Sequence, residues 1–340
     1  MSTPPTPPAP PNKQTPEQKV QQSPVFLGIM NELNGNSDQL GRRQKLISEI
    51  EAGLSARYGA QNKLISYIFR FGHPQAFMHS GDLPHWDTIL TSVSGAEQIN
   101  LVLHSPGGDG SIVEKMVDMC RAHLSGTNRK LRIIVPNVAK SAATVMVLGS
   151  DQILMGYPSE LGPIDPQVHV TVSGTHQQVS ALSFVESRDI LMRDLAAAIK
   201  AKKPTVGILT QLAGLNVPFI QEMAHQIDFA KMTAARLLEK YMLRPIYLKK
   251  TVRVRKANDI AEKLLSKKLF PVHGQFIDAN TAKNELGLQV ETLDMHDDLW
   301  LKIWEYYVRS EVQMNIPLFP NGPTKIKLFE SSKASLVTPG

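Results

Sequence analysis

The sequence predicts an α/β fold built around a mainly parallel sheet. Short apolar runs alternate with segments of helical periodicity between residues 37 and 155. This alternation is typical of βαβ units, in which helices connect neighbouring parallel strands. Two of the strand-to-helix turns also hold residues suited to chemistry, and ligands bind such sheets at the carboxyl ends of the strands. The pattern therefore predicts a functional site at that edge.

Each element of the first half follows from periodicity and flanking residues. Residues 37–58 form an amphipathic helix, with Ser37 as its N-cap and Gly59 as its stop. The later elements are a strand at 64–69, a helix at 85–93, a strand at 99–103, a helix at 111–124, a strand at 131–135, a helix from Ser141 and a strand at 152–155.

The second half is predicted to be mostly helical. Residues 180–242 have helical character, interrupted by Pro204 and Pro218. The elements that follow are a basic helix at 254–267, a short helix at 281–285, a strand at 288–290 and a helix at 296–314.

Composition and periodicity also predict how the chain is divided. Residues 1–24 are rich in Pro, Gln and Thr, so we expect a disordered arm. We expect one domain at 25–315, including a C-terminal helical extension at about 180–315, and a loose tail at 316–340. No run approaches about 18 apolar residues, which argues against a transmembrane helix. One cysteine, Cys120, excludes an internal disulfide framework and indicates a cytoplasmic location.

Charge is unevenly distributed along the chain. The net charge is +6, and the segment from Lys200 to Lys268 holds 15 Lys or Arg against 5 Asp or Glu. Aromatic residues are not interleaved with these cations, so a solvated helical face is favoured and no nucleic-acid partner is expected. Peripheral contact with an anionic membrane surface stays open as an alternative. No metal-ligand spacing or nucleotide-binding glycine pattern is present, which predicts a site without metal or cofactor.

The two informative turns complement each other chemically. In Pro136-Asn-Val-Ala-Lys-Ser-Ala-Ala-Thr-Val-Met-Val-Leu-Gly149 a strand leads into a small-residue helix that starts at Ser141. A helix start presents the hydroxyl, and the next amide, where partial positive charge favours an oxyanion. Upstream, the glycines of His104-Ser-Pro-Gly-Gly-Asp109 permit positive φ and convergent backbone N–H groups. A lone glycine turn is more often only a tight connection, but paired with Ser141 it indicates acyl transfer.

Four motifs in order resemble a known family. They are Ser105-Pro-Gly-Gly, Ala139-Lys-Ser-Ala-Ala, Gly149-Ser-Asp-Gln-Ile-Leu-Met-Gly and Leu161-Gly-Pro-Ile-Asp-Pro-Gln167. Together they resemble the serine dehydrogenase proteinase family, in the Clp-protease and signal peptide peptidase (SppA-like) class of serine peptidases. The resemblance covers about residues 60–170. A weaker match covers 260–290, where His273-Gly274 and Glu285-Leu-Gly-Leu-Gln-Val290 are similar to the family's last helix–strand element.

The resemblance implies a fold and a set of site residues. The fold is the Clp-protease/crotonase-like spiral of ββα units, with helical extensions that typically assemble ring-like homo-oligomers. Ser141 matches the nucleophile position, and the amides of Gly108 (with Gly107) and Ala142 match the oxyanion hole. The loop ending at Asp165 would line the site, with Asp165 expected to be a turn-forming residue rather than a catalytic acid.

The general base is where this sequence departs from the family. Signal peptide peptidases of this class use a lysine some tens of residues after the serine, and no lysine occurs between Ser141 and Lys200. Lys140 is adjacent to the serine and points away from it, so we expect it to meet an anionic group instead. The candidates for the base are Lys231 and His273, and His169 and His176 are less favoured alternatives.

The predicted function is that of a serine-type endopeptidase acting on a peptide or protein substrate through an acyl-enzyme on Ser141. Two alternatives remain at the level of sequence. One is a catalytically silent, ring-forming scaffold or peptide-binding module, suggested by the missing lysine. The other is an acyl-coenzyme A hydratase or hydrolase on the same fold, whose coenzyme phosphates could meet the basic segment.

Overall fold

A computed structural model describes residues 28–29, 31–32, 38–172, 174–315 and 323–339. The described residues from 38 onward form one compact unit. The predicted disordered arm at 1–24 lies outside the described residues. None of the helices in the described residues has the length and hydrophobicity of a membrane span.

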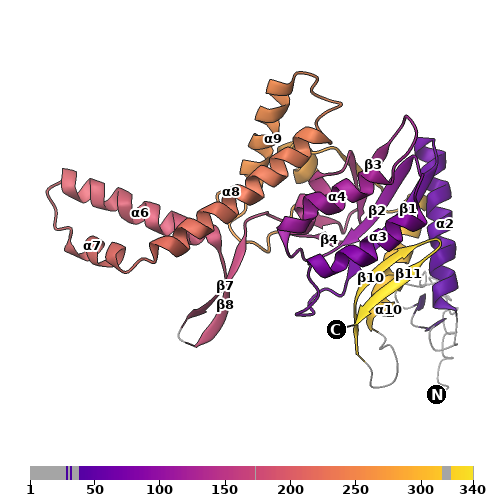
Figure 1. Ribbon diagram of the computed structural model, residues 1–340, viewed down its shortest axis with the longest axis horizontal. Helices are drawn as coiled ribbons and strands as arrows, with labels where there is room; N and C mark the ends of the chain where they lie inside the picture. The colour runs from indigo at the N-terminus through magenta and orange to yellow at the C-terminus, as the bar shows by residue number, and fades with distance from the viewer. Residues whose placement is uncertain (1–27, 30, 33–37, 173, 316–322, 340) are drawn as a thin grey trace, which may run out of the picture. The chain divides into compact units, whose positions relative to one another are not determined.

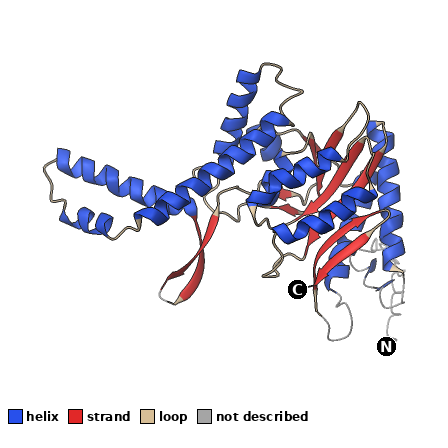
Figure 2. Ribbon diagram, viewed as in Figure 1, coloured by secondary structure: helices blue, strands red, loops and turns tan. Residues whose placement is uncertain are grey.

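A seven-stranded sheet with the order β11-β10-β1-β2-β3-β5-β9 forms the centre of this unit (Figure 1, Figure 2). Five strands, β1, β2, β3, β5 and β9, run parallel; β10 pairs antiparallel with β1, and β11 pairs antiparallel with β10. The predicted α/β class with a mainly parallel sheet is therefore confirmed. The strands of this sheet are β1 (Asn62–Phe69), β2 (Gln98–His104), β3 (Lys130–Val135), β5 (Gln152–Met155), β9 (Val290–Thr292), β10 (Lys325–Ser331) and β11 (Ser335–Pro339).

The helices lie at or near the positions predicted from the sequence. The helices are α2 (Gln39–Tyr58), α3 (Leu83–Ser92), α4 (Val113–Ala122), α5 (Ala142–Leu148), α6 (Ala181–Lys200), α7 (Val206–Ala213), α8 (Val217–Lys240), α9 (Lys250–Leu265) and α10 (Asp298–Asn315). Short 3-10 helices span Ser80–Asp82 and Gly110–Ile112, and a π-helical turn spans Thr281–Glu285. Pro204 lies between α6 and α7, as the sequence predicts, whereas Pro218 lies in the first turn of α8 and does not interrupt it.

Both faces of the sheet are covered by apolar side chains. Ile65, Tyr67 and Phe69 of β1 belong to one cluster, together with buried residues of α3, α4, α5 and α8. Leu64 and Ile68 belong to the other, together with α2 and α10. Parallel strands buried on both faces read as continuous apolar runs, which is why these strands could be predicted from sequence.

The expectation of a loose tail is wrong for residues 323–339. β10 pairs with β1, so this segment is an integral part of the central sheet. The sequence did not indicate a core strand here because the segment contains charged residues. Two of them, Lys327 and Glu330, are nevertheless fully buried in the structure. The Nζ of Lys327 lies 2.6 Å from Asp82 Oδ1, and Glu330 accepts hydrogen bonds from Arg43. A charged strand can be buried only when distant partners neutralise it, and sequence periodicity does not identify those partners.

The predicted helical extension at about 180–315 ends earlier than expected. α6 buries only Ala181, and α7 buries none of its residues. By contrast, β9 extends the central sheet and α10 packs against α2. Residues after about 277 therefore belong to the same core as the first half of the chain.

The buried pair between Arg43 and Glu330 generates a prediction for stability. We expect Arg43→Ala to lower the free energy of unfolding by about 3–5 kcal/mol, because Glu330 would keep its charge in the core with only the Tyr306 hydroxyl as donor. Arg42→Ala is the control: its ion pair with Glu305 leaves the arginine side chain 34% exposed, so the loss should be no more than about 1 kcal/mol. Urea denaturation measures both variants, and equal losses would contradict the burial argument.

Candidate active site

Backbone hydrogen bonds hold four chain segments together at the carboxyl edge of the sheet. The N–H of Ser105 donates to the carbonyl of Val138 (2.9 Å), and the N–H of Lys140 donates to the carbonyl of Ser105 (3.1 Å). Leu161 and Ile277 exchange two hydrogen bonds of 2.9 Å. Between them, β4 (Val138–Ala139) pairs with β6 (Glu160–Leu161). These two-residue strands, too short to be read from periodicity, fix the glycine turn, the serine turn and two later loops to one another.

Ser141 has a strained backbone at the start of α5. Its φ and ψ are 53° and −121°, in a region that residues other than glycine rarely occupy. Strain of this kind costs about 1–3 kcal/mol and is concentrated at functional sites. The side chain does not cap α5, and its hydroxyl makes no hydrogen bond to another described residue. The turn therefore presents a partly exposed hydroxyl that no internal contact uses.

The glycine turn lies directly against the serine. A Cβ on Gly107, where φ is +105°, would stand 2.9 Å from Ser141 Cβ and 3.1 Å from the Ala142 nitrogen. A Cβ on Gly108, where φ is +141°, would stand 2.4 Å from the nitrogen of Met78. Both positions require glycine, because backbone atoms occupy the space that a side chain would need.

The amides of the two turns are not equivalent. The N–H of Gly107 donates to Ser105 Oγ at 3.1 Å and is thereby occupied. The N–H groups of Gly108 and Ala142 donate to no other described residue. Three amides are predicted from the sequence to form the oxyanion hole, and these two of them are free to bind a ligand oxygen.

His273 and Asp165 form a hydrogen-bonded pair. His273 Nδ1 lies 2.7 Å from Asp165 Oδ1, and Asp165 is 5% exposed. A carboxylate oxygen accepts hydrogen bonds, so Nδ1 is the donor of this pair and Nε2 is the ring nitrogen left for another partner. Gln167 Nε2 donates to the other carboxylate oxygen at 2.7 Å. The expected turn-forming role did not include this contact, in which the Asp165 side chain meets a histidine 108 residues later in the chain.

Lys140 fixes the loop that carries this histidine. Its Nζ donates to the carbonyls of Gly274 (3.0 Å) and Gln275 (3.2 Å), and lies 3.0 Å from Glu160 Oε1. Three acceptors use all three donors of the ammonium group. The anionic group predicted for Lys140 is thus the chain's own Glu160, and no donor remains for a substrate.

The other candidate bases lie in different surroundings. Lys231 of α8 makes an ion pair of 2.6 Å with Glu262 of α9, and both side chains are partly or largely solvent-exposed. His169 and His176 lie on the hairpin of β7 (Gln167–Val172) and β8 (Thr175–Ser180), where both are exposed. None of these three residues has a contact that links it to the serine turn, whereas the His273 loop has one through Lys140.

A buried histidine and a half-buried carboxyl group lie behind the glycine turn. His104, which immediately precedes Ser105, accepts a hydrogen bond at Nδ1 from the N–H of Val138. Burial lowers the pKa of His104 to about 3 and raises the pKa of Glu311 to about 7. His104 is therefore neutral at neutral pH, and its Nε2 lies 3.6 Å from Glu311 Oε1, beyond hydrogen-bond distance. This side of the glycine turn thus contains a carboxyl group whose ionisation is disfavoured by its surroundings.

The comparison with protein families identifies the segment that contains both turns. Residues 82–213 match the family described as ClpP-like SDH-type serine proteinase. The matched region includes the glycine turn, Ser141 and Asp165, and ends before His273. The predicted resemblance and the predicted Clp-protease-like α/β class are confirmed by this match and by the parallel sheet.

Curated relatives match a smaller part of the chain. The uncharacterized protein MJ0137 of Methanocaldococcus jannaschii is 28% identical over 144 residues, 42% of this chain and 44% of that protein. The uncharacterized protein MJ1495 of the same organism is 31% identical over 70 residues, 21% of this chain and 23% of that protein. The chain thus spans less than half the length of either relative.

Solved structures with some likeness include two proteases and a hydratase. A variant of the 1510-N membrane-bound stomatin-specific protease is 18% identical, with a TM-score of 0.27, over 39% of this chain and 63% of that one. Another variant, in complex with a substrate peptide, is 17% identical, with a TM-score of 0.26, over 68% and 92%. A putative enoyl-CoA hydratase/isomerase from Novosphingobium aromaticivorans is 11% identical, with a TM-score of 0.26, over 63% and 92%.

The raised pKa of Glu311 predicts a pH-dependent stability difference. A carboxyl group with a folded-state pKa above its ordinary value of 4.5 destabilises the folded state increasingly as pH rises from 4.5 through 7. Because Gln carries no charge, we expect Glu311→Gln to raise the free energy of unfolding by about 2 kcal/mol at pH 8, with the gain shrinking below pH 5. Denaturant unfolding at both pH values measures it. A gain of equal size at both values would contradict the assigned cause.

Proposed function

We propose that this chain, which carries a ClpP-like SDH-type serine proteinase segment at residues 82–213, is a serine peptidase that acts through an acyl-enzyme on Ser141. The observation that carries the proposal is the pairing of His273 with buried Asp165 in loops fixed to the serine turn. In this proposal the pair supplies the general base, in place of the lysine that the sequence lacks between Ser141 and Lys200. It also removes the reason to prefer a catalytically silent scaffold.

Each group has a defined role in the proposed reaction. His273 Nε2 accepts the proton of the Ser141 hydroxyl as its oxygen attacks the peptide carbonyl carbon. Asp165, bound at Nδ1, stabilises the imidazolium that forms and keeps the ring in the productive tautomer. The N–H groups of Gly108 and Ala142 stabilise the oxyanion. The imidazolium then protonates the leaving amine, and a water activated by the same histidine hydrolyses the ester to the carboxylic acid.

The proposal is tested on three variants and one control. Ser141→Ala should abolish labelling by a fluorophosphonate, and both Ser141→Ala and His273→Ala should lower kcat on a fluorescent casein substrate by at least about 1,000-fold. Asp165→Asn should lower it by about 100-fold or more, because the wrong tautomer is then favoured. Lys231→Ala should stay within about twofold of the parent, since its ammonium pairs with Glu262.

The outcomes separate the candidate bases. Loss of activity in Lys231→Ala with retention in His273→Ala would assign the base to the lysine and overturn the triad. Labelling of Ser141→Ala equal to that of the parent would overturn the nucleophile. Circular dichroism of each variant confirms that it is folded before activity is compared.

The exposed arm formed by α6 and α7 supports self-association with further copies of this chain. Large apolar side chains on it are solvent-exposed, including Ile199 (63%), Val206 (74%) and Leu209 (48%). Large apolar side chains exposed in number on one segment are typical of an interface between protein chains. The homo-oligomer expected from the family resemblance would cover it.

We expect Val206→Glu with Leu209→Glu to reduce the assembled mass of the protein, because two charges would enter the apolar contact. Analytical ultracentrifugation measures the mass. Leu248→Glu is the control, since Leu248 is 88% exposed and lies outside the arm. A monomeric parent protein, or equal effects of the two changes, would contradict assembly through this surface.

Three further expectations stay predictions. They are a cytoplasmic location, a site without metal or cofactor, and the absence of a nucleic-acid partner. The substrate is proposed only as a peptide or protein chain, and a peripheral membrane contact of the basic segment stays open beside it.

A further inference from the structure

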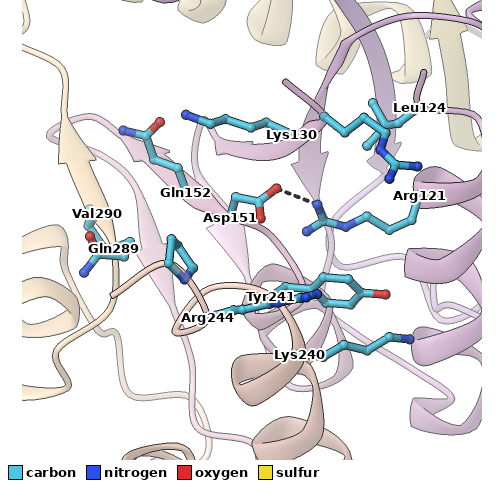
Figure 3. Close-up of a pocket in the computed structure, with 12 residues that line it drawn as sticks. Arg121, Leu124, Lys130, Asp151, Gln152, Lys240, Tyr241, Arg244, Gln289 and Val290 are labelled. Atoms are coloured by element: carbon cyan, nitrogen blue, oxygen red, sulfur yellow. Dashed lines mark hydrogen bonds and ion pairs between the residues drawn. The ribbon is translucent and has the colours of Figure 1, made fainter. Parts of the chain in front are cut away.

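An open cavity of about 830 Å³ lies at the edge of the sheet opposite the serine turn (Figure 3). Lys130 and Gln152, the first residues of β3 and β5, line the cavity at the amino ends of these strands. Ser141, in contrast, follows the carboxyl end of β3. The end of α8 closes the other side with Lys240 and Tyr241. The cavity is therefore separate from the candidate active site.

The lining of this cavity is strongly cationic. It contains one carboxylate, Asp151, against five cationic side chains: Arg121, Arg129, Lys130, Lys240 and Arg244. These residues come from α4, the loop before β3, β3 itself, α8 and the turn after α8, so the tertiary structure gathers the charge from segments more than 100 residues apart. Positive charges gathered in one cavity raise the local concentration of anions.

Some of these cations are held in place and others are available. Arg121 lies 2.5 Å from Asp151 Oδ2 and stacks on Tyr241, with its guanidinium carbon 4.1 Å from the ring centroid. Figure 3 shows this ion pair between Lys130 and Gln152 on one side and Tyr241 and Lys240 on the other. The side chains of Arg129, Lys130 and Arg244 make no ion pair or hydrogen bond within the part of the chain that the structure describes.

We propose that this cavity binds a small molecule that carries adjoining phosphate groups. Its volume falls in the range of about 300–1,000 Å³ that is typical of small-molecule sites, which argues against a folded partner. Guanidinium groups bind phosphate oxygens in bidentate fashion, and three of the five cations are arginines. Arg121 and Lys240 are paired with Asp151 and Asp118, which leaves three cations unpaired within the described residues, Arg129, Lys130 and Arg244, to meet the phosphate charges. A nucleoside triphosphate and an inorganic polyphosphate share this chemistry.

The test is calorimetric titration of the full chain with sodium tripolyphosphate at physiological salt. We expect saturable binding, weakened about tenfold or more in the double variant Arg129→Ala with Arg244→Ala. The matched control is Lys202→Ala with Lys203→Ala, which removes the same charge from exposed residues outside the cavity. That control should keep the affinity within about twofold. Citrate, with a comparable charge on carboxylates, should bind more weakly than tripolyphosphate.

The result with ATP identifies the source of the phosphates. Tighter binding of ATP than of tripolyphosphate supports the site and assigns it to a nucleotide, and equal or weaker binding supports it and assigns it to the phosphate chain. Absence of saturation up to about 1 mM tripolyphosphate would overturn the proposal. Equal weakening in the two double variants, or citrate binding as tight as tripolyphosphate, would do the same. Peptidase activity is not part of the readout, so the result is independent of the proposed catalytic function.

Discussion

The candidate site depends on one buried ammonium group. Lys140 Nζ contacts the carbonyls of Gly274 and Gln275 and the carboxylate of Glu160. Its backbone meanwhile forms the serine turn, since the N–H of Lys140 is bonded to Ser105. One residue thus fixes the distance between the serine, the glycine turn and the histidine loop. A charge in this position is stable because all of its donors are used.

Preorganisation of the same kind extends to the carboxylate. Asp165 is buried with both oxygens engaged, one by His273 and one by Gln167, so its side chain has little freedom to rotate. The strained backbone of Ser141 and the two glycines that allow close approach complete the arrangement. Each feature alone has a structural explanation, but together they leave a free hydroxyl and two free amides, which is the arrangement expected for acyl transfer.

Much of the fold could be predicted from the sequence, and its failures share a physical cause. The parallel strands are apolar because they are buried on both faces, and the helices are amphipathic, so periodicity identifies both. β10 was not predicted because it contains Lys327 and Glu330, whose partners in the core, Asp82 and Arg43, are far away in the sequence. The partners of Lys140 and Asp165 could not be identified from the sequence for the same reason, since Glu160 and His273 lie 20 and 108 residues away from them.

The sequence by itself determined the α/β class, the serine turn, the glycine turn and the family resemblance, because each depends on neighbouring residues and local backbone preferences. Only the tertiary structure brought His273 to Asp165, saturated Lys140 with internal acceptors and gathered five cations around the second cavity. Those pairings form only when folding brings together residues that are far apart in the sequence. The sequence shows which chemical groups are available, and the tertiary structure determines which of them come into contact.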